Sequence, residues 1–531
     1  MMVDRRLFTP FDIVKEIWTH LDLPPAALPS LSLPGANGAA EQIRPVVPSS
    51  FKIGHLAQST IALSALGAAV AQSMLRRSTS SSLSSSSSSS SSIPRTTVPI
   101  RHAVLEFQCE RLYTLAGKPP AETWGPIGGL HPTADGHVRI HDAFPHHRRG
   151  ALALLGLPET CTDRRAVSER TRKWKAVELE TVAVEQKGLA IYALRSFAEW
   201  DTLPQAQALA DLPVSIRRIN MPPTSPSPSH SNAPRYSHSA EGPSTRPNQK
   251  CLSGLRVLEL SRVIAAPVAG KTLAAHGADV LWVTSPNLPD LPGLDREFSR
   301  GKRSIRLDLN VPADKARFLD LARSADVVIQ GYRPGSLAAR GLNIEDLARV
   351  NPGIVVANLS AFGPRGEWKG RRGFDSLVQA CSGINVAEAE RYGSGEASRA
   401  LPCQALDHGA GYLLATGVCA AVYHRENDRA EGRHVGAYVV DVSLAGVGKY
   451  LRSLGQYEGR SGFEGDDLSV LGVDGDGRRT EEEQAFFDTR QTPFGEMTFL
   501  RHSASVEGFE PGWDLMPSPL GSDEAVWADG A

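Results

Sequence analysis

Short apolar runs alternate with helical stretches from residue 254 onward. The runs RVLEL (256–260), ADVLWV (278–283), DVVIQ (326–330) and GIVVANLS (353–360) are rich in β-branched residues, as strands are. Stretches at 266–277 and near 312–323 and 343–350 lie between them and have the pattern of helices. Strands separated by helices of about ten residues predict βαβ units. We therefore expect an α/β fold with a doubly wound, Rossmann-like parallel sheet in this half.

The glycine motifs of two common nucleotide-binding classes are missing from this half. No GxGxxG follows the first predicted strand, and no GxxxxGK[ST] is present. Both a nicotinamide dehydrogenase and a P-loop NTPase are therefore disfavoured. A parallel sheet still offers a crevice at the carboxyl ends of its strands, where another phosphate-bearing ligand can bind.

Two low-complexity stretches divide the chain. The serine tract at 81–92 cannot bury a core and predicts a disordered insert over 79–92. The Pro-, Ser- and His-rich stretch at 221–250 predicts a disordered linker. The predicted parts are an N-terminal segment at 1–50, one half at 51–220, the linker, a second half at 251–450, and a C-terminal return segment at 451–531.

The two halves share a short repeat. SALGAAVAQ (64–72) matches ATGVCAAVYH (415–424) when Ala68–Val70 is placed on Ala420–Val422. Each helix is followed by a predicted strand, at 97–107 and at 434–446. In this register His55 aligns with Asp407. The interpretations are an internal duplication whose first copy has lost a carboxylate, or a coincidence between two Ala-rich helices.

Composition narrows the class of protein. With 57 basic and 58 acidic residues, the net charge of −1 disfavours a general nucleic-acid or membrane-surface binder. The apolar run at 61–75 is shorter than the roughly 18–20 residues of a membrane span, so a buried helix is expected there. The 6 cysteines form no CxxC pair, so no metal site is predicted. The start of the chain lacks an apolar signal core, and a cytoplasmic protein is expected.

Several ordered stretches of the second half resemble one enzyme family. They are LSGLRVLELSRVIAAPVAGKTLAAHGADVLWV (252–283), RGKRSIRLDL (300–309), GYRPGSLAARGL (331–342) and LSAFGPRGEWKGRRGFDSLVQA (359–380). Together they resemble the family III CoA-transferases, the CaiB/BaiF family, which includes formyl-CoA transferase and α-methylacyl-CoA racemase. The first half resembles the smaller α+β domain of that family, with a strand pair at 129–140.

The resemblance implies a fold and an activity. The implied fold is the family III CoA-transferase fold. Because the small-domain signature precedes the nucleotide-binding half, and because family members are interlocked homodimers, an intrachain pseudo-dimer or a homodimer is expected. The implied reaction moves CoA from an acyl-CoA thioester to a free carboxylic acid. It proceeds through an aspartyl acyl anhydride and an aspartyl-CoA thioester.

The family pattern also nominates site residues. Asp407 aligns with the nucleophile, and an aspartate with a pKa near 4 is expected to be ionised at pH 7. The CoA-binding positions are Val263, Leu307, Gly331, Tyr332 and Arg372. Lys302, Arg303 and Arg340 are basic neighbours without an assigned role. Coenzyme A is expected as part of the substrate, with no separate cofactor and no metal. The expected partners are an acyl-CoA and a small carboxylic acid.

Alternatives remain at three points. An aspartate before an apolar helix at 409–423 can simply be its N-cap. Phe374 stands where racemases of the family have a histidine, which disfavours a racemase because that reaction needs two bases. Thr284–Pro286 replaces the family's acidic and basic pair, and 391–400 is the nearest stand-in for its glycine loop. The alternatives are thus a racemase-like isomerase or a degenerate, non-catalytic CoA-binding protein.

Overall fold

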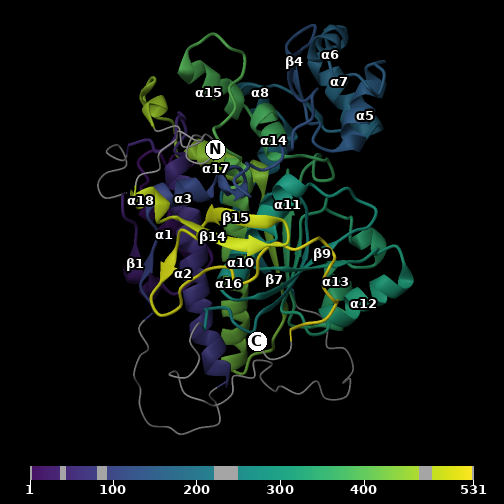
Figure 1. Cartoon of the computed structure of the whole chain (residues 1–531). Helices are drawn as coiled ribbons and strands as arrows, with labels where there is room; N and C mark the ends of the chain where they lie inside the picture. The colour runs from purple at the N-terminus through teal and green to yellow at the C-terminus, as the bar shows by residue number, and fades with distance from the viewer. Residues whose placement is uncertain (1–2, 36–43, 80–92, 220–248, 466–480, 529–531) are drawn as a thin grey trace.

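A seven-stranded sheet forms the centre of the molecule (Figure 1). The computed structural model describes residues 3–35, 44–79, 93–219, 249–465 and 481–528. The sheet order is β10-β9-β8-β11-β12-β13-β7. Its strands are β7 (Val214–Ile219), β8 (Arg256–Leu260), β9 (Asp279–Thr284), β10 (Arg303–Arg306), β11 (Val327–Gln330), β12 (Val355–Ser360) and β13 (Ala437–Ser443).

Six of these strands are parallel, and only β7 runs antiparallel, against β13. The parallel order predicted for 256–260, 279–283, 326–330 and 354–359 is therefore confirmed. The strands are buried almost throughout, because helices cover both faces of the sheet. The β7 strand lies before the predicted linker, so the sheet joins segments from both sides of residues 221–250.

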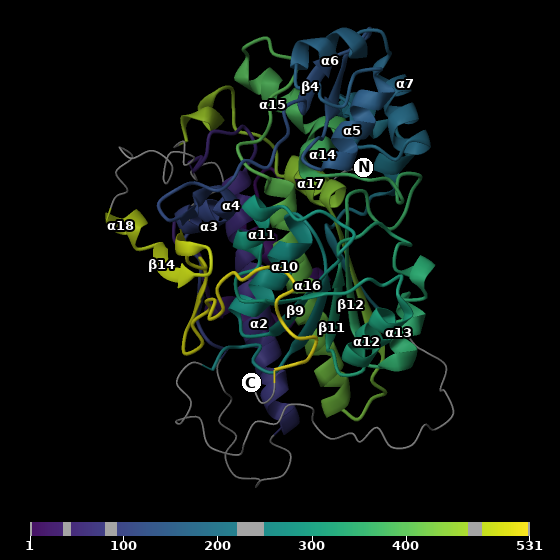
Figure 2. The ribbon, with the colours of Figure 1, turned by 45° about the vertical axis from the view of Figure 1, so that its right-hand side comes forward.

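Helices cover the sheet from two sides (Figure 2). One face packs on α12 (Pro312–Ala322) and α13 (Ile344–Val350), with Phe318 and Leu347 in the same apolar cluster as Leu258 and Val328. The other face packs on α10 (Ala265–Ala275) and α16 (Ala405–Ala430). Further helices of this half are α11 (Pro292–Phe298), α14 (Asp375–Cys381), α15 (Ile384–Tyr392) and α17 (Leu444–Ser453).

The long helix α2 (Ile53–Thr79) lies directly against α16 (Figures 1 and 2). A Cβ atom at Gly67 would stand 3.2 Å from the Cβ of Cys419, and one at Gly409 would stand 3.2 Å from Leu56. The two helices therefore run parallel. Gly67 and Cys419 are also equivalent in the repeat register. Residues Ile53–Leu75 are long and apolar enough to cross a membrane, but all of them except Ser73 are buried in the protein, in agreement with the buried helix predicted for 61–75.

A smaller α+β unit lies above the sheet in both views. It contains the antiparallel strands β4 (Gly129–Pro132), β5 (His137–Ile140) and β6 (Ile191–Ala193), which confirms the strand pair expected at 129–140. Its helices α5 (Pro145–Leu154), α6 (Arg164–Thr171) and α7 (Ala176–Thr181) enclose a separate apolar core around Ile140, Leu152 and Leu179.

The remaining elements are α1 (Pro10–His20), β1 (Leu31–Ser32), β2 (Thr96–Thr97), α3 (Ile100–Glu106), α4 (Cys109–Leu112), β3 (Thr114–Leu115), α8 (Phe197–Asp201), α9 (Pro204–Ala208), α18 (Glu481–Gln484), β14 (Phe487–Thr492), β15 (Gly495–Leu500) and β16 (Ser505–Val506). Among them, α1, α3, β2 and β16 pack against α2.

The strand predicted at 97–107 is wrong. Only Thr96–Thr97 is a strand, and Pro99 is followed at once by the helix α3. Proline is well placed at a helix start because its missing N–H would have no partner there. The serine tract at 80–92 and most of the linker, 220–248, lie outside the described residues, so the predictions made for them and the domain boundaries stay predictions.

Candidate active site

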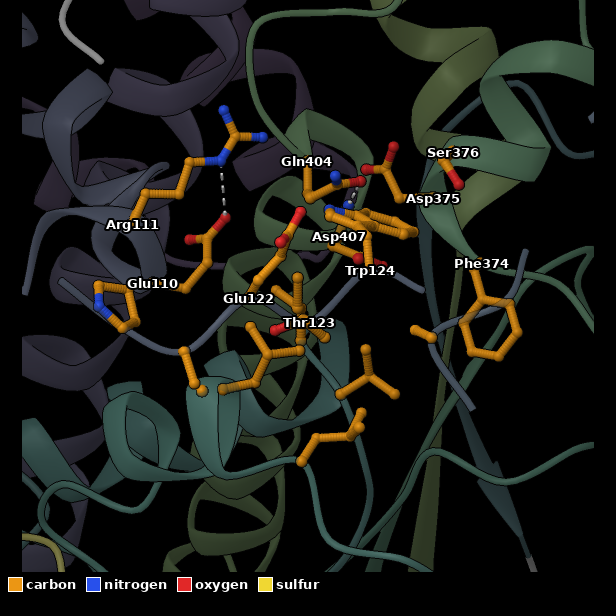
Figure 3. Close-up of a pocket in the computed structure, with 18 of the residues that line it drawn as sticks. Glu110, Arg111, Glu122, Thr123, Trp124, Phe374, Asp375, Ser376, Gln404 and Asp407 are labelled. Carbon is orange, nitrogen blue, oxygen red and sulfur yellow. Dashed lines mark hydrogen bonds and ion pairs between the residues drawn. The ribbon is translucent and has the colours of Figure 1, made fainter. Parts of the chain in front are cut away.

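A cavity of about 250 Å³ lies where α14 and α16 begin, beside the segment that follows β8 (Figure 3). Segment 119–124, between β3 and β4, closes one side of it. The cavity is lined by acidic, aromatic and aliphatic side chains that come from both halves of the chain. The lining residues used below are Glu110, Arg111, Glu122, Trp124, His141, Val263, Leu291, Leu294, Phe374, Asp375, Gln404 and Asp407.

Asp407 lies in the first turn of α16 and lines this cavity. Its side chain is 7% exposed, and no hydrogen bond from the described residues reaches its carboxylate oxygens. The alternative that Asp407 is an N-cap is wrong, because α16 begins at Ala405 and the N-cap position belongs to Gln404. The helix also starts earlier than predicted, which places Asp407 inside it.

Asp375 performs the capping instead. Its Oδ2 accepts hydrogen bonds from the backbone N–H of Leu406 at 2.8 Å and of Asp407 at 2.9 Å. Its Oδ1 accepts one from the side-chain amide of Gln379. These N–H groups are among those that a helix leaves without partners in its first turn. Because Asp375 satisfies them, the Asp407 carboxylate is left without a structural task.

The cavity disfavours negative charge on both aspartates. Burial raises the pKa of Asp407 well above its usual value, and the nearby Asp375 and Glu110 raise it further. Burial also raises the pKa of Asp375 to about 6, although its hydrogen bonds oppose the shift. The expectation that Asp407 has a pKa near 4 is therefore wrong. The Asp407 carboxylate is already poorly solvated. A bound substrate that excludes water from the cavity therefore removes little further solvation from it.

Glu110 is the third acid of the cavity, and it is tied to a histidine behind it. His408 Nε2 is 3.0 Å from Glu110 Oε2, and Arg111 Nε is 3.9 Å from Oε1. Burial would raise the pKa of Glu110, but the His408 charge and hydrogen bond outweigh it, so that pKa lies below its usual value. Glu110 therefore adds a negative charge beside Asp407.

One group of possible metal ligands lies in the described part of the chain. It consists of Cys109, Glu110 and His408, all buried, with ligand atoms within 4.8 Å of one another. However, His408 already bonds Glu110, and Lys271 Nζ lies 3.4 Å from Cys109 Sγ. A metal ion would add a second cation beside Lys271, so these residues fit a hydrogen-bonded cluster better than a metal centre.

Val263 adopts a strained backbone conformation at the cavity. It follows β8 and has a φ of 73°, which is unusual for a β-branched residue. Such strain costs on the order of 1–3 kcal/mol and concentrates at functional sites. Val263 lines the cavity and the neighbouring hollow, so the strained turn lies where the two meet.

Two further hollows lead away from the cavity along the carboxyl ends of the strands. The first shares Val263 and Leu291 with the cavity. The second, of about 220 Å³, shares Thr284, Ser285, Leu288 and Tyr332 with the first and is also lined by Leu307 and Arg340. The middle hollow holds only about 20 Å³, and the three adjoin one another through these shared residues. They define a path from Leu307 to Asp407 along the edge where parallel sheets bind ligands.

Three of the five nominated binding residues, Val263, Leu307 and Tyr332, line this path. Gly331 does not line it. A Cβ there would stand 2.8 Å from that of Ala266, so glycine allows the end of β11 to approach α10. Arg372 does not line it either, because its guanidinium packs against Gly188 of the small unit.

An unpaired group of cations lies near the path. Arg262, Arg333 and Arg372 have no carboxylate partner among the described residues. Burial lowers the pKa of Arg372, and the charge of Arg333 lowers it further. Burial, Arg372 and Arg262 all lower the pKa of His146. Asp290 and Asp295 act on Arg262 electrostatically without forming an ion pair with it. Three arginines without ion pairs among the described residues are a candidate place for phosphate groups.

Of the other basic residues named from the sequence, two form ion pairs and one lines a hollow. Lys302 forms a buried ion pair with Glu259, and Arg303 pairs with Asp279, so both have structural roles. Arg340 lines the outer hollow, and its hydrogen bonds within the described residues go to uncharged oxygens of Asn310 and Ser336.

Sequence reasoning missed several lining residues. No local sequence pattern pointed to Glu110, Trp124 or Arg262 as site residues, because the tertiary structure alone brings each of them to the site. Segment 391–400, the expected stand-in for a glycine loop, contributes no residue to the cavity, whereas segment 119–124 does. Phe374 stacks on His141, with ring centroids 3.8 Å apart.

Comparisons with known proteins agree with the resemblance. A family model described as CoA-transferase family III matches residues 252–465. An acyl-CoA transferase of Gibberella moniliformis is 31% identical over 334 residues, covering 59% of this chain and 54% of that protein. A probable fatty acyl-CoA transferase of Mycobacterium tuberculosis is 36% identical over 209 residues, covering 37% and 52% respectively.

A third relative is a succinate–glutarate CoA-transferase of Agrobacterium fabrum, 35% identical over 218 residues, which cover 38% of this chain and 54% of that protein. The chain thus spans about half the length of the curated relatives it matches. The model match covers the four ordered stretches of the second half on which the resemblance rests. Residues 252–465 therefore belong to CoA-transferase family III.

Proposed function

We propose that this protein transfers CoA between an acyl-CoA thioester and a free carboxylic acid, with Asp407 as the nucleophile. The observation that carries the proposal is the unpartnered Asp407 carboxylate at the inner end of a path lined by nominated CoA-binding residues. The matched relatives include an acyl-CoA transferase and a succinate–glutarate CoA-transferase, so the reaction class agrees with their names.

The reaction balances without any further reagent. An Asp407 oxygen attacks the thioester carbonyl carbon, the C–S bond breaks, and CoA leaves as a thiolate while a mixed anhydride forms. The thiolate attacks the Asp407 carbonyl of that anhydride, the donor acid leaves, and an aspartyl-CoA thioester remains. The acceptor carboxylate then attacks the same carbonyl and expels the thiolate. The thiolate finally attacks the acceptor's carbonyl, which forms the new acyl-CoA and regenerates Asp407.

Coenzyme A would follow the three hollows. The adenine end fits the outer hollow at Leu307 and Tyr332, and Arg340 there can meet a phosphate. Val263 lies where the pantetheine arm would enter the cavity. Gly331 would act by letting the chain pass close to α10, while Arg372 and its neighbours Arg262 and Arg333 offer charge for the pyrophosphate.

The racemase alternative receives no support. Phe374 takes the position of the expected histidine, and burial lowers the pKa of the adjacent His141 to about 3. An imidazole that holds its proton so weakly is a poor base at pH 7.

We also propose that the chain is an intrachain pseudo-dimer. Equivalent residues of the repeat, Gly67 and Cys419, meet between the parallel helices α2 and α16. When a two-fold axis runs parallel to two such helices and between them, equivalent residues of the two copies lie opposite each other, as Gly67 and Cys419 do. Sedimentation equilibrium tests this proposal, because a monomer is expected and a tight homodimer would favour pairing between chains.

Trapping the intermediate tests the proposed reaction. Incubation with acetyl-CoA and hydroxylamine should convert Asp407 to its hydroxamate, which intact mass and peptide mapping detect. A derivatised residue other than Asp407 would refute the assignment. Calorimetric binding of CoA without any exchange would instead indicate a degenerate binding protein. Loss of the α-deuteron label from a 2-methylacyl-CoA would indicate the isomerase.

A further inference from the structure

The cavity around Asp407 has an apolar wall that faces open space. Trp124 is 44% exposed although it is a large aromatic residue, and its ring stands edge-on to His141 with centroids 5.2 Å apart. Leu291, Leu294 and Phe374 line the same cavity. An exposed tryptophan over an apolar pocket is typical of a surface that a ligand covers.

The polar lining of the cavity is mostly acidic. Glu110, Glu122, Asp375 and Asp407 contribute carboxyl groups, whereas Arg111 is the only arginine or lysine among the lining residues. Arg111 is already engaged, since its guanidinium donates to the carbonyl of Pro402 at 2.8 Å and lies beside Glu110.

Histidine does not offset this acidity at the cavity wall. His141 is held neutral by burial, because its pKa is about 3. Two basic side chains act from behind the wall. His408 pairs with Glu110, and Arg139 on β5 interacts with Asp375. No cationic side chain of the described lining is therefore free to receive a second substrate carboxylate.

The size of the cavity assigns it to the acyl end of a substrate. At about 250 Å³ it is at the small end of ligand sites, which hold roughly 300–1,000 Å³, and in the proposed function CoA lies along the two outer hollows instead. The donor acid leaves before the acceptor acid attacks, so both acids use this same space.

From this lining we infer that the protein selects monocarboxylic acids with an apolar chain and rejects dicarboxylic acids as both donor and acceptor. Trp124 and Glu122 are the selecting residues, the first by apolar contact and the second by repulsion of a distal carboxylate. This inference rests on the proposed function, because it names the substrates of the same site.

A matched pair of acceptors tests the inference. Hexanoate and adipate have the same six-carbon chain and differ by one distal carboxylate. With acetyl-CoA as the donor, kcat/KM for hexanoate should exceed that for adipate by roughly 100-fold or more, the range that a pocket reaches by rejecting a wrong group. Equal values, or a preference for adipate, would overturn the inference while leaving CoA transfer intact.

A binding measurement separates this inference from the reaction itself. The Asp407→Asn protein should bind hexanoyl-CoA at least about tenfold more tightly than adipyl-CoA in calorimetry. If this preference appears but no variant catalyses exchange, the proposed function fails and the selectivity stands. Equal affinities for the two thioesters would refute the selectivity directly.

Substitutions of Glu122 and Trp124 test whether these two residues produce the selectivity. Glu122→Lys should raise kcat/KM for adipate about tenfold, whereas Glu169→Lys, at an exposed site on α6, should not change it. Trp124→Ala should lower kcat/KM for hexanoate about tenfold and for acetate less than about threefold. Phe11→Ala, which removes an exposed ring on α1, is its matched control. A uniform loss for both acids in Trp124→Ala would contradict the role of Trp124.

Discussion

At the residue scale, the site depends on a division of labour between two aspartates. Asp375 accepts the backbone N–H groups at the start of α16, and the Asp407 carboxylate has no hydrogen bond from the described residues in a cavity that disfavours its charge. One carboxylate stabilises the helix, and the other is available for attack. The resemblance identified Asp407, but local pattern gave it the capping role that belongs to Asp375, because that contact joins residues 32 positions apart.

Substitution of Asp407 separates catalysis from stability. Asp407→Asn should lower the exchange rate by at least roughly 10³-fold, since it removes the nucleophile. Because Asp407 caps no helix, Asp407→Ala should not show the loss of about 1 kcal/mol expected for a lost N-cap. Exchange assays and urea unfolding measure the two effects.

His55 provides the internal control for this prediction. It aligns with Asp407 but is fully buried, and burial lowers its pKa to about 3. His55→Ala should spare the exchange rate per folded molecule. Loss of exchange in His55→Ala together with full exchange in Asp407→Asn would show that the active copy is the first one.

The raised pKa of Asp407 predicts a pH dependence of stability. An acid whose pKa is higher in the folded state keeps its proton better there, so stability falls as pH rises from about 4 toward the folded pKa. Asp375, with a pKa of about 6, acts in the same direction. The Tm of Asp407→Asn minus that of the native protein should therefore increase with pH between 4 and 8. A difference independent of pH would contradict the raised pKa.

The raised pKa of Asp407 also predicts how the exchange rate depends on pH in acid. The exchange rate should fall on acidification through a midpoint well above the ordinary aspartate value of 3.8, because the protonated carboxyl does not attack. Asp375 and Glu110 both raise the pKa of Asp407 and contribute to the profile, so Glu110→Gln should move the midpoint downward by removing a neighbouring negative charge. An acid limb near pH 4 in the native protein would refute the shift.

At the element scale, the parallel helices α2 and α16 are the contact that joins the two halves. Their burial follows from sequence, since small and apolar residues predominate over 61–71 of α2 and over 409–422 of α16. The strands of the sheet could also be predicted from the pattern of apolar residues. The helix α3 could not, because the apolar residues of 97–107 fit a strand unless Pro99 is recognised as a helix start.

Close packing at Gly67 predicts a steric coupling with Cys419. Gly67→Cys alone should destabilise the protein by about 1–3 kcal/mol through overpacking. Adding Cys419→Gly removes the opposing side chain and should restore at least half of the loss. Urea unfolding of the four proteins of this cycle measures the coupling, and Gly136→Ala, with no atom within 4 Å of its Cβ, is a neutral control. Additive losses would show that the two positions do not touch.

At the scale of the whole molecule, the sheet cannot be assigned to one half. The β7 strand precedes residues 221–250 yet pairs with β13 through six residues, from Val214 with Val442 to Ile219 with Ala437. Sequence could not reveal this pairing, because antiparallel addition at a sheet edge depends on contacts between distant segments. The same limit applies to segment 119–124, which no motif connected to Asp407.

The pairing predicts that a cut chain stays together. A protease site introduced near residue 234, between β7 and β8, should yield two fragments that co-elute in gel filtration, because β7–β13 and α2–α16 still hold them. Separation should require denaturant. Fragments that part in buffer would show that the covalent connection maintains the sheet.

Segment 119–124 has one more consequence. It lies outside residues 252–465, the part that matches the family, yet it forms the wall that meets the acyl group. The reacting carboxylate and the surface facing the acyl group are thus encoded far apart and can mutate independently. A library randomised only at 119–124 would explore new acids while the chemistry stays fixed, and natural variation at this stretch would diversify substrates in the same manner.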